Sequence, residues 1–288
     1  MILVAYWRTG LLILTTLALS CSDPQTLPEY AIQVESLERQ YNLFAPQNTP
    51  STAMPLVVAF HGGGMAGEMF PQQAQFEALA ESQGVLLAFP QGFQVGNNEG
   101  EWQLNTRPDA RHDIEFVIAM IEDIGARHSV DPNRIYAVGY SLGSMFTYEV
   151  ACQLSDRFAA ITSFAGTMPQ SPAACSPERY TPIMHIHGDM DGIIPYTDSW
   201  GWKSWDEVGT MMDIPSLINF WSDKYACREE SLYEYDSSEH IVHSECEQSA
   251  LVEHHRIRAG DHGWPEDING ESTHRVMWSF LSRHSLSN

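Results

Sequence analysis

Hydrophobic and polar positions along the chain follow two periods, one typical of buried strands and one typical of amphipathic helices. Continuous apolar runs bounded by glycine, proline or polar residues predict strands. Such runs occupy residues 54–64 and 85–90, and the more mixed stretches at 39–45, 133–140, 158–166, 181–188 and 251–260 are also predicted to be strands. Apolar residues that recur every three to four positions predict helices, at 76–84, 113–128, 141–154, 214–225 and 273–284. Strands and helices therefore alternate along most of the chain.

Alternation of this kind predicts an α/β domain with a mostly parallel central sheet flanked by helices. The chain has 288 residues, of which 43% are hydrophobic, and this is enough for one large core. In such sheets the functional groups gather in the loops that follow the carboxyl ends of the strands. Candidate chemistry is therefore expected at the strand ends.

A serine stands between two glycines where one predicted strand gives way to a helix. The stretch AVGYSLGSM, residues 137–145, places Ser141 between Gly139 and Gly143. The glycines remove side chains that would clash around a sharp turn, so the turn can hold the serine in a strained, exposed position. The pattern favours a nucleophile at Ser141, and a plain structural turn is the alternative.

A nucleophilic serine needs a general base, and the base needs an acid that orients it. The loop after the strand at 181–188 offers Asp189 and Asp191, and the loop after the strand at 251–260 offers His262. The chain order serine, acid, histidine is that of the α/β-hydrolase fold. Residue type, order and position together predict this fold and a serine nucleophile.

Negative charge that develops on an acyl carbonyl oxygen needs hydrogen-bond donors, which backbone amides can supply. The stretch FHGGGMAG, residues 60–67, follows a buried strand and carries little side-chain bulk, so an amide near Gly63 is one expected donor. The amide of Leu142, next after the serine, is the other. A phosphate-binding glycine turn is the alternative, but no G-K-[ST] or G-x-G-x-x-G context supports it.

Several motifs taken together resemble those of a known group of enzymes. They are HGGG, FPQG, VDPNRIYAVGYSLGSM, DRFAAITSFAG, HIHGDMDGIIPY and GDHGWP. From about Tyr41 to the C-terminus the chain is similar to secreted α/β-hydrolase esterases of the poly(3-hydroxybutyrate) depolymerase, feruloyl esterase and acetylxylan esterase group. The resemblance implies that Ser141 attacks an ester carbonyl and that His262 is the base. It also implies that Asp191, rather than Asp189, is the acid.

The chain departs from that group at two places. Leu142 stands where the group usually carries asparagine after the serine, and Asp261 precedes the histidine where glycine is common. The change at Leu142 leaves the backbone amide in place but removes a polar side chain, so it bears on substrate details. The resemblance also implies a disulfide between Cys227 and Cys246.

Four cysteines lie beyond Cys21, and four cysteines allow three pairings. Sequence proximity favours Cys152 with Cys175 and Cys227 with Cys246. No C-x-x-C pair occurs, which argues against a cysteine-based zinc or redox site. Paired cysteines fit a protein that leaves the reducing cytoplasm.

The N-terminus has the features of an export signal. Arg8 precedes an uncharged, apolar run over residues 9–20, which is too short to span a bilayer and ends in LALSC. This predicts a signal peptide over residues 1–20, of the lipoprotein type with Cys21 lipidated. An ordinary signal cleaved near residue 20 is the alternative.

The formal net charge of −22, with only two lysines, argues against nucleic-acid and anionic-lipid partners. It indicates either a preference for neutral or cationic ligands or solubility outside the cell. We expect a tether over residues 21–37 and a monomeric catalytic domain over residues 38–288. Membrane contact is expected only through the lipid anchor, with the protein in the periplasm, at the cell surface or secreted.

Tryptophans near the expected site are candidates for stacking on a sugar or a phenolic acyl group. Trp102 and Trp264 are predicted to contact the substrate. The stretch SWGWKSW contains Trp200, Trp202 and Trp205, and it either lines the site or packs as an insertion with its own small core.

Two histidine pairs raise the question of a metal. His185 and His187 share one face of a predicted strand, whereas His254 and His255 point to opposite faces and make poor joint ligands. Buried strand histidines are commoner than metal ligands, so we expect no metal and no cofactor.

The sequence therefore predicts an exported serine esterase that acts through Ser141, His262 and Asp191. The expected substrates are polyester or plant-polysaccharide acyl esters, with feruloyl, acetyl or hydroxybutyrate groups. A serine peptidase or acyltransferase on the same fold is one alternative. A catalytically inactive surface lipoprotein that binds polysaccharide through its tryptophans is another.

Overall fold

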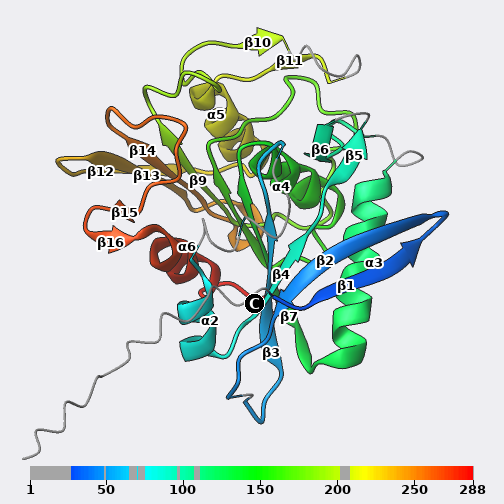
Figure 1. Cartoon of the computed structure of the whole chain (residues 1–288). Helices are drawn as coiled ribbons and strands as arrows, with labels where there is room; N and C mark the ends of the chain where they lie inside the picture. The colour runs from blue at the N-terminus through cyan, green and yellow to red at the C-terminus, as the bar shows by residue number, and fades with distance from the viewer. Residues whose placement is uncertain are drawn as a thin grey trace, which may run out of the picture.

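The central feature of the computed structural model is a ten-stranded sheet of order β1-β2-β4-β3-β7-β8-β9-β14-β13-β12 (Figure 1). Its strands are β1 (Glu29–Val34), β2 (Leu37–Phe44), β3 (Met54–Phe60), β4 (Leu86–Pro90), β7 (Val130–Tyr140), β8 (Ala160–Phe164), β9 (Ile183–Gly188), β12 (Glu229–Glu234), β13 (Ser238–Ser244) and β14 (Val252–Ile257). The structure describes residues 27–48, 50–64, 70, 75–95, 98–106, 111–201 and 208–287.

The middle of the sheet is parallel and its two margins are antiparallel. Strands β4, β3, β7, β8, β9 and β14 run parallel to their neighbours in that order. Every residue of β3, β4, β8 and β9 is buried, as expected for strands covered on both faces. The sequence prediction of a mostly parallel, helix-flanked α/β sheet is confirmed.

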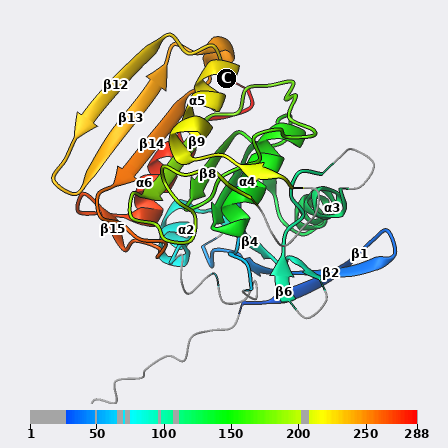
Figure 2. The same cartoon turned by 90° about the horizontal axis from the view of Figure 1, so that it is seen from above.

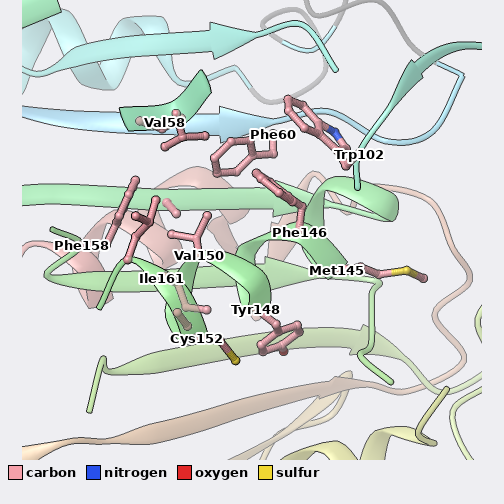
Figure 3. Close-up of a cluster of buried hydrophobic side chains, with 14 of the residues drawn as sticks. Val58, Phe60, Trp102, Met145, Phe146, Tyr148, Val150, Cys152, Phe158 and Ile161 are labelled. Carbon is pink, nitrogen blue, oxygen red and sulfur yellow. The ribbon is translucent and has the colours of Figure 1, made fainter. Parts of the chain in front are cut away.

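Helices cover both faces of the sheet (Figure 2). They are α2 (Glu77–Gln83), α3 (His112–Arg127), α4 (Leu142–Gln153), α5 (Ile214–Lys224) and α6 (Thr273–Leu281), with a short 3-10 helix at Glu247–Ser249. Val58 and Phe60 of β3 pack into the core shared with α3, α4 and α5 (Figure 3). Val57 and Ala59 pack into the core shared with α2 and α6. Each strand of the middle thus contributes alternate side chains to two cores.

Three small two-stranded sheets lie outside the central one. They pair β5 (Phe93–Val95) with β6 (Asn98–Glu101), β10 (Trp200–Gly201) with β11 (Thr210–Met211), and β15 (Asp267–Ile268) with β16 (Glu271–Ser272). Among the residues that the structure describes, no helix is long and apolar enough to cross a membrane.

The N-terminal boundary of the domain differs from the sequence prediction. We expected a tether over residues 21–37, but β1 at Glu29–Val34 pairs antiparallel with β2 along its whole length. Its side chains alternate between exposed and half-buried positions, which is the pattern of an edge strand. The sheet therefore begins within the expected tether. The expected signal peptide over residues 1–20 and the lipidation site Cys21 lie outside the described residues.

Both expected disulfides are present. Cys152 at the end of α4 is bonded to Cys175, and Cys227 after α5 is bonded to Cys246 after β13. The bonds span 23 and 19 residues. In the chain-entropy description a loop of this size stabilises the fold by roughly 3 kcal/mol.

A buried carboxyl group on α4 couples stability to pH. Glu149 is 8% exposed and accepts hydrogen bonds from the Asn105 amide at 2.7 Å and from Gln153 Nε2 at 2.8 Å. Burial raises the pKa of Glu149 to about 7, although these hydrogen bonds act in the opposite direction. The folded state therefore holds the proton more tightly than the unfolded state does.

We expect Glu149→Gln to remove this pH dependence. A pKa that is raised on folding favours the folded state below the unfolded value of 4.5, and this contribution is lost as pH rises through about 7. From about pH 5 to pH 8 the variant should gain about 2 kcal/mol of unfolding free energy relative to wild type. Urea unfolding at both pH values measures the difference. Parallel pH curves for the two proteins would contradict the prediction.

Candidate active site

Ser141 occupies a sharp turn between β7 and α4. Its backbone has φ 53° and ψ −117°, a region that side-chain-bearing residues rarely adopt. A Cβ atom at Gly139 would lie 2.3 Å from the Gly143 carbonyl oxygen, and one at Gly143 would lie 2.2 Å from the Phe60 carbonyl oxygen. The two glycines are therefore required by close backbone contact, and the turn presents Ser141 at the carboxyl end of the sheet.

The structure brings His262 and Asp191 to Ser141. His262 follows β14, and its Nε2 lies 2.9 Å from Ser141 Oγ. Its Nδ1 lies 2.7 Å from Asp191 Oδ2. The Nδ1–H therefore donates to the carboxylate, which leaves Nε2 free to accept the Ser141 hydroxyl proton.

The Asp191 carboxylate is buried and fully hydrogen-bonded. Its Oδ1 accepts from the amides of Ile193 and Ile194, both at 2.8 Å, and its Oδ2 also lies 3.3 Å from His187 Nε2. Burial raises the pKa of Asp191, but hydrogen bonds from His187, His262 and the two amides outweigh it, so the pKa lies well below its usual range. Asp191 is therefore ionised at neutral pH and presents a carboxylate to His262.

Asp189, the other acid considered from the sequence, stabilises the loop conformation instead. Its carboxylate accepts from the Ala259 amide at 2.7 Å and pairs with Arg256 at 3.1 Å. These contacts join the loop after β9 to the loop that carries His262. Asp189 thus holds the two loops in register while Asp191 contacts the imidazole.

A buried chain of polar side chains runs from Asp191 back into the core. His187 Nε2 donates to the Ile194 carbonyl at 2.9 Å, so its Nδ1 is the acceptor for His185 Nε2–H at 3.1 Å. Tyr148 of α4 donates in turn to His185 Nδ1 at 2.8 Å. All ring nitrogens of His185 and His187 are used in hydrogen bonds. Both histidines are buried strand residues, as expected from the sequence.

We expect His187→Leu to lower kcat about tenfold with little change in KM. Leucine removes a hydrogen bond to Asp191 and leaves the His185 donor and the Ile194 carbonyl unpaired, which loosens the carboxylate that orients His262. His187→Gln should retain more activity because its amide can still donate. Steady-state kinetics on p-nitrophenyl acetate measure both variants. Wild-type kcat in the leucine variant would rule out this positioning role.

The glycine-rich loop after β3 lies against Ser141 and Leu142. A Cβ atom at Gly62 would lie 3.4 Å from Ser141 Cβ, and one at Gly63 would lie 3.3 Å from Leu142 Cδ2. Leu142 is the first residue of α4, where a backbone amide has no partner within its own helix. The loop therefore lies beside both Ser141 and the first residue of α4.

His61 fixes this loop, a role that the sequence analysis missed. Its Nε2 accepts from the Gly92 amide at 2.9 Å, so Nδ1 carries the proton and donates to the Gly62 carbonyl at 2.7 Å. Burial lowers the pKa of His61 to about 4, which keeps the ring neutral. A histidine directly before three glycines at a strand end was the available signal.

Tyr140 is a second residue that was missed. Its hydroxyl donates to the backbone carbonyl of His262 at 3.0 Å, and its ring stacks on Phe164. Asp261 is exposed and its carboxylate accepts from the Gly263 amide at 2.8 Å, so it caps the turn beside the imidazole. Tyr140 thus ties the His262 loop to β7, and Asp261 stabilises the turn within that loop.

Trp102 does not present a surface to substrate, contrary to the sequence prediction. It is 0% exposed, packs against Phe60 and Phe146, and donates from Nε1 to the His61 carbonyl at 2.9 Å (Figure 3). A buried ring with a polar edge is favoured here because it both fills the core and holds the loop. Trp102 therefore helps to fix the backbone at His61, at the start of the glycine-rich loop.

Four other tryptophans lie near the expected site in the sequence, namely Trp200, Trp202, Trp205 and Trp264. Trp264 is half-buried and meets Tyr140 and Phe164 edge-on, next to the His262 loop. Its contact with substrate stays a prediction. Trp200 lies half-buried in β10, whereas Trp202 and Trp205 lie outside the described residues.

The fold and the arrangement at the strand ends define the class of protein. Ser141 lies on a strained strand-to-helix turn at the carboxyl end of a mostly parallel sheet, where it pairs with His262, which in turn pairs with Asp191. This fold and this arrangement are those of the α/β-hydrolases. More narrowly, the chain belongs to the phospholipase/carboxylesterase family, which matches residues 46–201.

Individual relatives agree with this assignment. The chain is 31% identical over 167 residues to a Nocardia uniformis subsp. tsuyamanensis protein named as an esterase, NocK, covering 57% of this chain and 48% of the relative. It is 24% identical over 241 residues to feruloyl esterase B of Piromyces equi, covering 83% and 44%. It is 22% identical over 255 residues to the bifunctional acetylxylan esterase/xylanase XynS20E of Neocallimastix patriciarum, covering 86% and 34%.

The chain therefore spans about a third to a half of the length of these curated relatives. Among solved structures, the acetyl xylan esterase from Aspergillus awamori superposes with a TM-score of 0.67. The two share 14% sequence identity over 88% of this chain and 99% of that one, so this likeness supports the fold.

Proposed function

We propose that the protein is a serine carboxylic-ester hydrolase. The observation that carries the proposal is the hydrogen-bonded sequence Ser141 Oγ, His262 and Asp191, with heavy-atom distances of 2.9 and 2.7 Å. These distances are those required for proton transfer from the hydroxyl to the imidazole and for orientation of the imidazole by the carboxylate.

The mechanism follows from the geometry. Ser141 Oγ attacks the ester carbonyl while its proton passes to His262 Nε2, and Asp191 stabilises the imidazolium that forms. The amides near Gly63 and of Leu142 donate to the oxyanion of the tetrahedral intermediate. His262 then gives the proton to the leaving alcohol, and an acyl-enzyme remains on Ser141. Water, deprotonated by His262, releases the acid through the same steps in reverse.

The proposed substrates are acyl esters of plant polysaccharides or polyesters. Relatives named feruloyl esterase, acetylxylan esterase and poly(3-hydroxyalkanoate) depolymerase support this class. The half-buried Trp264 beside the His262 loop offers a flat surface for an aromatic or sugar ring. The formal charge of −22 favours neutral substrates over polyanions.

We also propose that the protein is exported, with residues 1–20 removed and Cys21 lipidated. The two disulfides support an oxidising compartment. In this arrangement the catalytic domain is monomeric and meets a membrane only through the anchor. Mass spectrometry of the mature N-terminus would give a diacylated or triacylated Cys21 peptide, and an N-terminus ahead of residue 20 would contradict the assignment.

A fluorophosphonate probe and a substrate panel test the ester-hydrolase proposal. The probe should modify Ser141, as shown by peptide mapping, because a serine activated by histidine attacks phosphorus readily. The panel contains p-nitrophenyl esters, acetylated xylan, feruloylated arabinoxylan, poly(3-hydroxybutyrate) and peptide amides. Hydrolysis of esters but not amides is expected. Faster cleavage of peptide amides would indicate a peptidase, and an unreactive protein that binds xylan would indicate an inactive binding domain.

A further inference from the structure

A second cluster of chemically capable side chains lies away from Ser141, on the face of the sheet that α6 covers. His240 of β13 and His255 of β14 are directly opposite each other across the two antiparallel strands. Glu253 precedes His255 by two residues and so shares its face of β14. The buried chain of His185 and His187 lies on the other face, because Ile186 between them packs into the α6 core.

The three side chains converge. His240 Nε2 lies 3.0 Å from Glu253 Oε2, and the imidazoles of His240 and His255 stack with centroids 4.0 Å apart. One ligand atom from each of the three residues lies within 4.8 Å of the other two. Two ligand atoms 3.0 Å apart match a shared ion about 2.1 Å from each.

His255 gives the independent reason to look for a ligand. It is 6% exposed, and among the residues that the structure describes neither of its ring nitrogens has a hydrogen-bond partner. Buried polar groups in folded proteins are nearly always paired, so an unpaired imidazole beside a carboxylate indicates an absent partner. Burial lowers the pKa of His255 to about 3, so the ring is neutral and keeps a lone pair for an electrophile.

Glu253 is held as a ligand would be. Arg283 Nη2 donates to its Oε1 at 2.7 Å, which fixes the carboxylate and leaves Oε2 directed at His240. Burial raises the pKa of Glu253, but hydrogen bonds from His240 and Arg283 outweigh it and the pKa lies below its usual value. The group is therefore anionic near neutral pH.

The cluster opens into a cavity of about 550 Å³ between the sheet and α6. Its lining includes His240, Glu253 and His255, with Arg275 and Glu271 at the α6 end. The cavity gives an ion a route from solvent and space for water ligands. Joint ligation requires the two stacked imidazoles to tilt toward each other at their nitrogen ends.

We propose that His240, Glu253 and His255 form a binding site for a divalent transition-metal ion, with Zn²⁺ the best match. Two neutral imidazoles and one carboxylate are a ligand set that Zn²⁺ favours, and cavity water completes the coordination. On binding, the ion replaces the proton that His240 Nε2 shares with Glu253, and the imidazole carries its proton on Nδ1 instead. The ion ties β13 to β14 and stabilises this margin of the sheet without entering the ester chemistry.

Thermal unfolding and calorimetry of the tag-free protein with ZnCl₂ alone test the site. Wild type should bind one Zn²⁺ per chain, and Tm should rise by roughly 5–10 °C when free Zn²⁺ exceeds Kd about 100-fold. His255→Phe keeps a flat ring but supplies no ligand. It should lose the Zn²⁺-dependent rise while keeping at least the wild-type Tm without metal. His262→Ala is the matched control, because it removes the active-site imidazole and should keep the full response.

Two results would overturn the proposal. One is an equal Zn²⁺ response in wild type and His255→Phe, and the other is loss of the response in His262→Ala, which would move the ion to the ester-cleaving site. If His255→Phe does not fold, crystals of wild type soaked in ZnCl₂ decide the matter. An anomalous difference peak between His240, Glu253 and His255 supports the site, and a map without that peak refutes it.

Discussion

Replacing Ser141 with alanine is expected to lower kcat for p-nitrophenyl acetate by about 10⁴- to 10⁶-fold. The variant loses Ser141 Oγ, the proposed attacking atom, which lies 2.9 Å from His262 Nε2. Tm should change little, because alanine meets the same backbone strain at φ 53° and removes no core packing. The expected residual rate comes from water attack aided by the proposed oxyanion donors.

The measurement is steady-state kinetics beside circular-dichroism melts of the same preparations. Ser82→Ala is a suitable control, because Ser82 is exposed on α2 and its hydroxyl donates to the Leu79 carbonyl within the same helix. It should retain wild-type kcat. A folded Ser141→Ala protein with wild-type turnover would remove the basis of the ester-hydrolase proposal and leave the metal-site proposal untouched.

Gly143→Ala is expected to have the largest effect on stability, at about 4 kcal/mol or more. The added Cβ would lie 2.2 Å from the Phe60 carbonyl oxygen and 2.5 Å from the His61 carbonyl oxygen. Both are backbone atoms, so relief requires α4 to move away from β3. Such a shift also displaces the Leu142 amide and Ser141, and activity should fall with stability.

Gly125→Ala gives the matched comparison. Gly125 lies in α3, and a Cβ atom there would meet nothing within 4 Å. Alanine at an open helical position should stabilise the protein by about 0.5–1 kcal/mol. Urea unfolding of both variants separates a general glycine effect from the close contact at Gly143. Equal stability changes in the two would show that the contact at Gly143 relaxes without cost.

The sequence predicts the central architecture well because local patterns of apolar residues determine that part of the fold. Buried parallel strands are continuous apolar runs, so β3, β4, β8 and β9 were found directly. The turn at Ser141 was predicted because a glycine on each side of it indicates a position where the backbone has no room for a side chain. The pairings Cys152–Cys175 and Cys227–Cys246 followed from short sequence separations.

Other features depend on contacts between distant segments, and the sequence carries little trace of them. Trp102 was expected at the substrate, yet it is buried because its ring fits between Phe60 and Phe146. His187 supports Asp191 only because the loop after β9 folds back over its own strand. The strand at residues 29–34 was missed because edge strands alternate polar and apolar residues weakly.

One of the two outermost strands of the sheet, β12, bears on how copies of this chain meet one another. Glu229, Glu230 and Glu234 lie along its exposed edge, beside the exposed Leu232 and Tyr233. An open strand edge with apolar residues is a template for another strand, but aligned carboxylates repel a second copy that approaches it. At high protein concentration and low ionic strength near neutral pH, this repulsion should therefore limit aggregation through β12. Added salt should screen the repulsion and increase aggregation.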